Sequence, residues 1–197
     1  MSIYKVPAEL EEKIEATPQR TDISHFMNVT RVVKDAKEGD TVWSKMGSGW
    51  TNNTESPSAQ TKERKFINEK SKRKNITSYS PSFAFEVLLM FNKPEVRMVY
   101  DIYTRRKTGV DAVVTMVTVD EFDTPKKGYY PARKGNYAVE VSSCDDDDDM
   151  IIKGNLNGQG DEAIGWFDPE NGEWLDSDPE AEPESQSDEP APEDDEE

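Results

Sequence analysis

The sequence predicts a mainly β fold, a β-sandwich or barrel with one flanking α-helix. Short segments of alternating apolar and polar residues recur between residues 23 and 175, and turn-forming residues separate them. Between these residues, one segment, about residues 94–107, has its apolar residues at helical spacing instead. Roughly eight strands and one helix in this order are typical of an antiparallel sheet with a helix packed on its side.

Four strands are expected before the helix. The strongest pattern is the last of them, in which Phe83, Phe85, Val87, Leu89 and Phe91 share one face. Its other face turns apolar toward the end, as in a strand that is covered on both sides. The four segments are residues 23–33, 41–44, 62–69 and 82–91.

The helix is expected to begin at Pro94, because proline suits the first helical turn. The basic residues 105–107 would lie at its C-terminal end, where cations interact favourably with the helix dipole, and Gly109 would end it. The residues expected to pack against the sheet are Val96, Val99, Tyr100 and Tyr103.

After the helix, a strand is expected to be interrupted near Gly135. Gly154, Gly158 and Gly160 are expected in tight turns with positive φ. A phosphate-binding loop is rejected here, because neither Lys-Ser/Thr nor a helix follows these glycines. The expected strands are residues 110–122, 129–132, 137–143, 150–156 and 163–167.

Residues 45–61 are interpreted as a long inter-strand loop, because glycine, serine, threonine and asparagine dominate them. Loops of this length inside a small domain are usually functional or disordered. Trp50 argues for function, since an aromatic side chain in a polar loop gains little unless it docks on another surface. We therefore expect this loop to contact a neighbouring molecule.

The two ends of the chain differ from its centre. Residues 1–22 are polar and are interpreted as an extended N-terminal arm. Residues 176–197 contain 12 acidic residues and no basic one, which predicts a disordered acidic C-terminal tail. The domain itself is expected over residues 23–175. Without the tail, the chain has 29 acidic and 24 basic residues, so a strongly basic DNA-binding domain is excluded.

No enzymatic activity and no cofactor are expected. His25 is the only histidine and Cys144 the only cysteine, so neither a zinc site nor a nucleophile paired with a base is indicated. The aspartate run predicts at most a weak divalent-cation site, and a solvated loop is the favoured interpretation. The oxygen ligands of such a weak metal site would come from Asp145, Asp147 and Asp149.

A basic run at residues 62–74 carries seven basic and two acidic side chains. A basic segment on an acidic protein has electrostatic complementarity with another copy of the same chain, which favours self-assembly over nucleic-acid binding. The residues expected at contacts between subunits are Met46, Trp50, Lys62, Arg64, Lys65, Lys72, Arg73 and Lys74.

The order of these features resembles that of the major tail protein (tail tube protein) of long-tailed, siphovirus-type phages of Gram-positive bacteria. The resemblance covers about residues 20–175, and its firmest points are the strand-helix-strand order and the segment Gly-Asn-Leu-Asn-Gly-Gln-Gly-Asp beginning at Gly154. It also includes the long loop, the segment Tyr-Ser-Pro-Ser-Phe-Ala-Phe-Glu-Val beginning at Tyr79, and Gly-Trp-Phe-Asp beginning at Gly165.

This resemblance implies a tail tube fold and a structural role in the virion. Such proteins polymerise as stacked hexameric rings around a channel through which DNA is ejected without specific binding. The implied partners are further copies of the chain, the tape measure protein, the tail terminator and the distal tail protein. The implied location is the phage tail, after assembly in the host cytoplasm. No membrane partner is expected, because no run approaches the ~20 apolar residues of a membrane span.

Two other functions remain open from the sequence. The first is a capsid decoration or other virion structural protein, which would bind a preformed lattice. The second is a nucleic-acid-binding β-barrel module that uses the basic run from Lys62 to Lys74.

Overall fold

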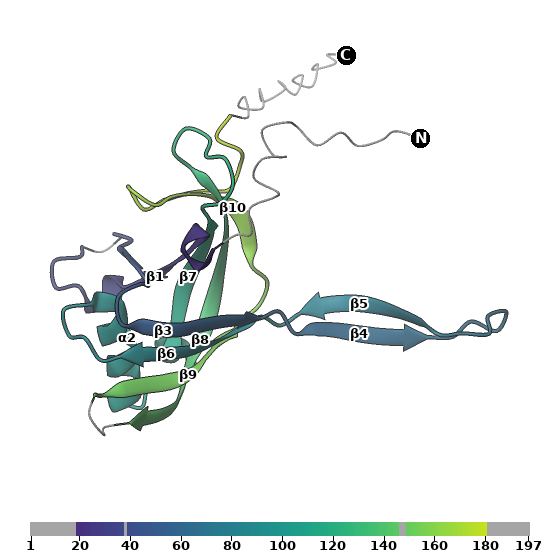
Figure 1. Ribbon diagram of the computed structural model, residues 1–197, viewed down its shortest axis with the longest axis horizontal. Coiled ribbons are helices and arrows are strands. Elements are labelled where there is room, and N and C mark those ends of the chain that lie inside the picture. Colours follow the sequence, from purple (N-terminus) through teal and green to yellow (C-terminus); the bar gives the residue numbers. More distant parts are fainter. Residues whose placement is uncertain (1–18, 38, 146–148, 181–197) are drawn as a thin grey trace, which may run out of the picture.

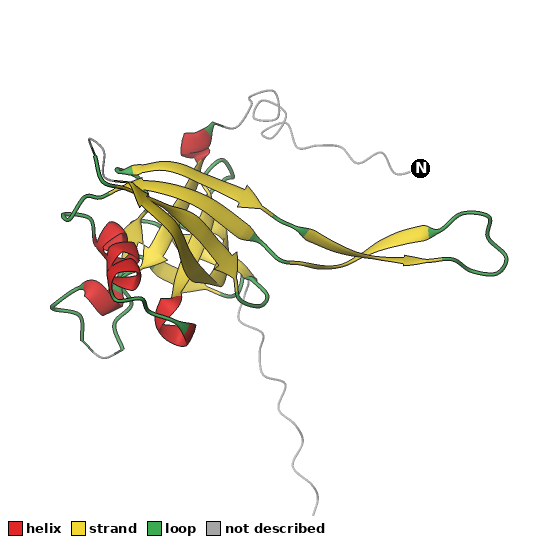
Figure 2. Ribbon diagram, turned by 90° about the horizontal axis from the view of Figure 1, so that it is seen from below, coloured by secondary structure: helices red, strands yellow, loops and turns green. Residues whose placement is uncertain are grey.

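Nine antiparallel strands form one curled sheet in the computed structural model, which describes residues 19–37, 39–145 and 149–180 (Figure 1). Along the sheet the strand order is β2-β1-β7-β8-β9-β6-β3, and β10 and β11 extend it from β8. The sheet curves into a half-barrel around the core (Figure 2). The mainly β class with one flanking α-helix is confirmed: α2 is the only α-helix in the part of the chain that the structure describes.

The bounds of the elements follow the predicted alternation in most places. The strands of the curled sheet are β1 (Ile23–Asn28), β2 (Trp43–Lys45), β3 (Trp50–Ser56), β6 (Ser82–Leu88), β7 (Val113–Asp120), β8 (Tyr130–Asp145), β9 (Ile151–Gly158), β10 (Ala163–Asp168) and β11 (Glu173–Leu175). Two further strands, β4 (Ala59–Arg64) and β5 (Arg73–Tyr79), form a separate two-stranded sheet. The helices are α2 (Pro94–Thr104) and the short 3-10 turns η1 (Arg20–Asp22), η2 (Thr30–Val32) and η3 (Gly109–Ala112).

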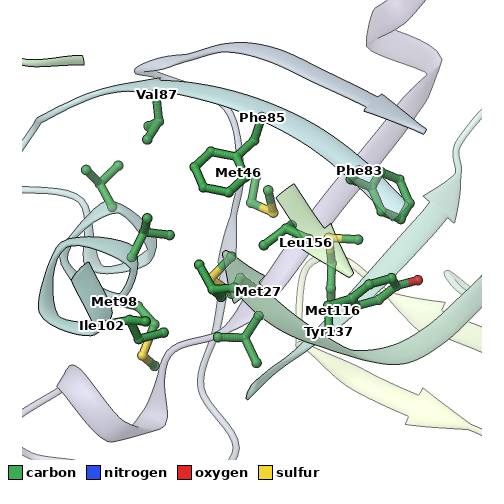
Figure 3. Packing of buried hydrophobic residues seen from close by; sticks show 14 of the residues in the cluster. Met27, Met46, Phe83, Phe85, Val87, Met98, Ile102, Met116, Tyr137 and Leu156 are labelled. Atoms are coloured by element: carbon green, nitrogen blue, oxygen red, sulfur yellow. The ribbon is translucent and has the colours of Figure 1, made fainter. Parts of the chain in front are cut away.

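The main core lies inside the curl of the sheet (Figure 3). Phe83, Phe85 and Val87 of β6 are all buried in it, as their alternation predicted. The expected face does not continue, because β6 ends at Leu88 and Phe91 is exposed. Phe83 meets Tyr137 of β8 edge to face, with ring centroids 5.4 Å apart. Such aromatic pairs add specificity and about 0.5–1.5 kcal/mol beyond the area they bury.

The prediction of positive φ is wrong for Gly154 and Gly158, which lie within β9, and correct for Gly160. Gly154 is required for a different reason. A Cβ atom there would lie 2.0 Å from the carbonyl oxygen of Glu140 and 2.9 Å from the ring of Phe85. The absent side chain therefore lets β8 and the Phe85 ring close over β9.

β8 runs without interruption through Gly135, contrary to the expectation of two strands. On one side it pairs with β7; on the other it pairs first with β10 and then with β9. Gly135 lies where this second neighbour changes, and a Cβ there would come within 3.0 Å of the Tyr137 ring. The glycine thus makes room for a core side chain and does not end the strand.

The helix α2 begins at Pro94 as predicted and ends at Thr104, before the expected basic residues. Val96 and Val99 are buried, while Tyr100 and Tyr103 are only partly covered. Met98 and Ile102 are buried instead of the two tyrosines. The buried face of the helix is therefore rotated about the helix axis relative to the predicted face. Figure 3 shows Met98 and Ile102 reaching from the helix toward Met27.

The segment 45–61 is not a loop, and this correction matters most for function. It contains β3 and the start of β4, and β3 pairs with β6 from Trp50 to Ser56. Trp50 is only 7% exposed, and its ring centroid lies 5.7 Å from that of Phe85. β3 is polar because it is an edge strand, and main-chain pairing holds such a strand without an apolar alternation.

The described parts of both ends contact the domain. Arg20 donates two hydrogen bonds of 3.3 Å to the carbonyl oxygen of Thr51 on β3. At the other end, Asp178 pairs with Lys126, and Lys127 donates to the carbonyl oxygen of Pro179. The expected arm at residues 1–18 and the expected disorder at residues 181–197 lie outside the described residues. None of the helices in the described ranges is long and apolar enough to cross a membrane.

Candidate assembly surface

The β4–β5 hairpin is the outer half of a longer β-ribbon. β3 leads into β4 and β5 leads into β6, so the inner half of the ribbon belongs to the curled sheet. Pro57 and Pro81 lie at the junction, where each lacks the N–H group that a continuous ladder would need. Ser58 has a φ of 48°, so the backbone turns sharply there. We call residues 57–81 the projecting hairpin.

The projecting hairpin extends away from the body of the protein in both views (Figures 1 and 2). Every residue of β4 and β5 is exposed, and among the described strands these two pair only with each other. An isolated two-stranded hairpin is at best marginally stable in water. Contact with another molecule would therefore stabilise this part of the chain.

Few interactions stabilise the hairpin from within. Glu63 lies opposite Lys74, but Arg64 lies directly opposite Arg73, and like charges in this position are destabilising. Lys72 pairs with Glu63 at 3.2 Å, and Arg73 pairs with Glu69. Exposed ion pairs of this kind contribute about 0–1 kcal/mol each.

The charge of the hairpin is opposite to that of the rest of the chain. It carries seven of the 24 basic residues, whereas the whole chain has 41 acidic ones. Only Lys72 and Arg73 of its cations form ion pairs with described residues. The cations without such a partner are Lys62, Arg64, Lys65, Lys70 and Lys74.

Apolar side chains lie among these charges. Phe66 and Ile67, in the turn at the tip, are both exposed, as are Ile76 and Tyr79 on β5. The ring of Phe66 is covered only in part by Arg73, whose guanidinium carbon lies 5.6 Å from the ring centroid. Cations with apolar residues between them are suited to a partner that offers both carboxylates and apolar contact.

The root of the hairpin is held by a network of charges. Arg133 of β8 donates hydrogen bonds of 2.9 and 3.1 Å to the two carboxylate oxygens of Glu55, near the end of β3. It also pairs with Glu162 at 3.6 Å, and the Tyr137 hydroxyl donates to Glu162. The bond with Glu55 raises the pKa of Arg133, and burial above all raises that of Tyr137.

Beside this network, burial lowers the pKa of His25 to about 4, so the imidazole is neutral at pH 7. Its Nδ1 lies 3.0 Å from the Thr118 hydroxyl oxygen. Nearby, Trp50 Nε1 and the side-chain amide of Asn53 are buried without a hydrogen-bond partner among the described residues.

The structure brings six of the eight predicted contact residues together on one feature. Lys62, Arg64, Lys65, Lys72, Arg73 and Lys74 all lie on the projecting hairpin. Met46 and Trp50 are instead buried in the core of their own chain. They were expected at a contact because they lie in a segment interpreted as an open polar loop. Since their side chains are already covered by their own chain, that reason no longer applies.

Of the predicted metal ligands, Asp145 ends β8 and pairs with Lys153 at 2.8 Å. Asp147 lies outside the described residues, and Asp149 is exposed. No group of three or more metal-ligating side chains occurs among the residues that the structure describes. Phe66, Ile67 and Tyr79 were not among the predicted contact residues, although an apolar pair inside a run of cations was a signal for the first two.

Comparison with known proteins gives little further information. No family model and no curated protein matches the sequence. A chain in the cryo-electron microscopy structure of the baseplate of the anti-feeding prophage, six-fold symmetrised, is similar with a TM-score of 0.43 and 12% sequence identity. The similarity covers 76% of this chain and 96% of that one. Likeness at this level does not identify a family.

Proposed function

We propose that this protein is a structural protein of a phage tail, whose copies join one another through the projecting hairpin. The observation that carries the proposal is that β4 and β5 pair only with each other among the described strands and are exposed along their whole length. A domain that extends a strongly cationic two-stranded ribbon from an acidic body is incomplete as a monomer. Another copy of the chain supplies the opposite charge.

The curled sheet supports the same proposal. Its path ends in two strands, β2 and β3, that each have a strand neighbour on one side only among the described elements. Unpaired strand edges favour pairing with further strands. When each copy passes its hairpin to a different surface of the next copy, the contact is heterologous, and it repeats as a closed ring or an open filament.

The details of the proposed assembly follow from the resemblance of the sequence to tail tube proteins. Six copies form a ring, stacked rings form the tail tube, and DNA leaves the virion through the channel. The tape measure protein, the tail terminator and the distal tail protein are the further partners. The protein has no catalytic role in this scheme, and it acts in the virion after assembly in the host cytoplasm.

Negative-stain electron microscopy of the concentrated protein tests this form directly. We expect rings or tubes about 100 Å wide, from six domains of this size around a channel that admits DNA. Dispersed particles of single-chain size at every concentration would contradict the proposal. Binding only to a preformed capsid would favour the alternative role in decoration.

Nucleic-acid binding through Lys62–Lys74 remains the second candidate, because five of these seven cations form no ion pair with a described residue and an exposed ring, that of Phe66, lies among them. It predicts DNA binding that weakens steeply as salt rises. The acidic body favours the first proposal, since it would repel the rest of a nucleic-acid strand.

A further inference from the structure

A groove lies at the root of the projecting hairpin, between β5 and the turn that joins β9 to β10. Its volume is about 500 Å³. It is bounded on one side by Tyr79 of β5, and on the other by Asp161 and Glu162 of the turn and Ile164 of β10. We call this the root groove, and the side chains that define it are Glu55, Tyr79, Arg133, Asp161, Glu162 and Ile164.

The root groove combines apolar surface with negative charge. Tyr79 is 57% exposed and Ile164 is 71% exposed, so two large apolar side chains face solvent at one site. Three carboxylates line the same groove, and Arg133 is the only cation among its lining residues. Arg133 is already engaged by Glu55 and Glu162, and Asp161 makes no ion pair with a described residue.

The tip of the projecting hairpin offers the complementary set. Phe66 and Ile67 are exposed apolar side chains, and Lys65 and Lys70 on either side of them have no ion pair with a described residue. Apolar residues flanked by cations match apolar residues flanked by carboxylates, and such matching selects the partner and the register of a contact.

We propose that the hairpin tip of one copy docks in the root groove of a second copy. In this contact Phe66 and Ile67 lie against Tyr79 and Ile164, while Lys65 and Lys70 approach Asp161 and Glu162. A chain cannot make this contact with itself, because the six residues of β4 alone place the tip roughly 20 Å from the root. In the proposed contact the second copy passes its own tip to a third copy, so the arrangement is head to tail, as a growing ring or tube requires.

This inference rests on the proposed function, because it names the surface that receives the hairpin. Cysteine cross-linking tests it, with Ile67→Cys and Ile164→Cys introduced together into a Cys144→Ser background. The Cα atoms of a disulfide lie within about 7 Å, so a bond between these positions reports docking of tip on groove. We expect covalent dimers and longer ladders on mild oxidation of the assembled protein.

The matched control pairs Ile67→Cys with Val110→Cys, because Val110 is exposed but is not part of the groove. It should give no more cross-linking than either single cysteine. A second variant, Asp161→Lys, places a cation against the cationic tip and should raise the concentration needed for assembly by at least about tenfold.

The outcomes distinguish two claims: that the hairpin joins the copies, and that its tip docks in the root groove. Assembled particles that show no 67–164 cross-link, or that tolerate Asp161→Lys, would overturn the root groove as the docking site. They would not contradict the proposal that the hairpin joins the copies. Cross-linking of residue 67 to residue 110 in equal yield would overturn the root groove too. A chain that stays monomeric at every concentration would overturn both claims.

Discussion

Arg133 binds both carboxylate oxygens of Glu55, and this contact ties the long strand β8 to the end of β3 where the projecting hairpin begins. Both side chains are largely covered, at 29% and 27% exposed. Bidentate pairs between a guanidinium and a carboxylate fix geometry as well as charge. Arg133 also pairs with Glu162, so one guanidinium joins β8, the end of β3 and the turn before β10 at the root of the hairpin.

We predict that Arg133→Ala destabilises the protein by about 2 kcal/mol, because it leaves two partly buried carboxylates without their cation. Arg133→Lys should recover part of the loss, since it restores the charge without the paired geometry. Denaturant unfolding measures both. Lys153→Ala is the control, because its more exposed ion pairs should contribute less than about 1 kcal/mol. Equal effects of Arg133→Ala and Lys153→Ala would refute the structural role of Arg133.

Trp50 and Phe66 should behave oppositely when each is replaced by alanine. Trp50→Ala removes a buried ring from the core and should cost about 3–5 kcal/mol of stability. Phe66→Ala changes an exposed side chain and should leave stability within about 0.5 kcal/mol while weakening assembly. Thermal unfolding and sedimentation distinguish the two effects. A stable Trp50→Ala variant that merely fails to assemble would instead show that Trp50 lies at a contact.

Val99 tests the placement of the helix. Its side chain is fully buried, so Val99→Asp forces a carboxylate into the core and should unfold the domain. Arg97→Asp introduces the same group on the exposed side of the same helix and should retain the native circular dichroism spectrum. A folded Val99→Asp protein would mean that the helix does not pack against the sheet as described.

His25 predicts a loss of stability in mild acid. Its pKa of about 4 in the folded protein lies below the 6.5 of an unperturbed histidine, so the unfolded chain binds the additional proton between these two values. The contribution is fully present above about pH 7 and is lost as the pH falls toward 4, by about 2 kcal/mol between pH 7.5 and 5. The groups that act on the imidazole are Thr118, Glu55, Arg133 and Arg20.

His25→Gln isolates this effect, because glutamine can still bond to Thr118 but does not titrate. The difference in unfolding free energy between the variant and the parent chain should change by that amount over the same pH range. Parallel pH profiles for the two proteins would show that His25 is accessible to protons in the folded state.

The sequence predicted those parts of the fold in which burial sets a regular pattern. Phe83, Phe85 and Val87 alternate because β6 has one face in the core, and Pro94 marks a helix start for a purely local reason. β3 was missed because Asn52 and Asn53 on an edge strand give no apolar alternation. Main-chain hydrogen bonds to β6 hold that strand in place, and main-chain pairing does not require a particular pattern of side chains in the sequence.

The candidate site was predicted in its composition but not in its shape. The run of cations from Lys62 to Lys74 is evident in the sequence, as is its contrast with an acidic chain. The run projects as a hairpin because its two strands pair with each other and not with the curled sheet. Which strands pair is decided by the whole sheet and cannot be read from this segment alone. The prolines at 57 and 81 mark the junction, but each also occurs in ordinary turns.

The most direct test of the central claim compares the full chain with a variant that lacks only the projecting hairpin. Ser56 and Ser82 are cross-strand partners, so an Asn-Gly turn in place of residues 57–81 joins β3 to β6 in their native register. Sedimentation velocity over a concentration series should show large assemblies for the full chain, weakened by salt, and folded monomers for the variant. Equal assembly of the two proteins would contradict the claim that the hairpin joins the copies.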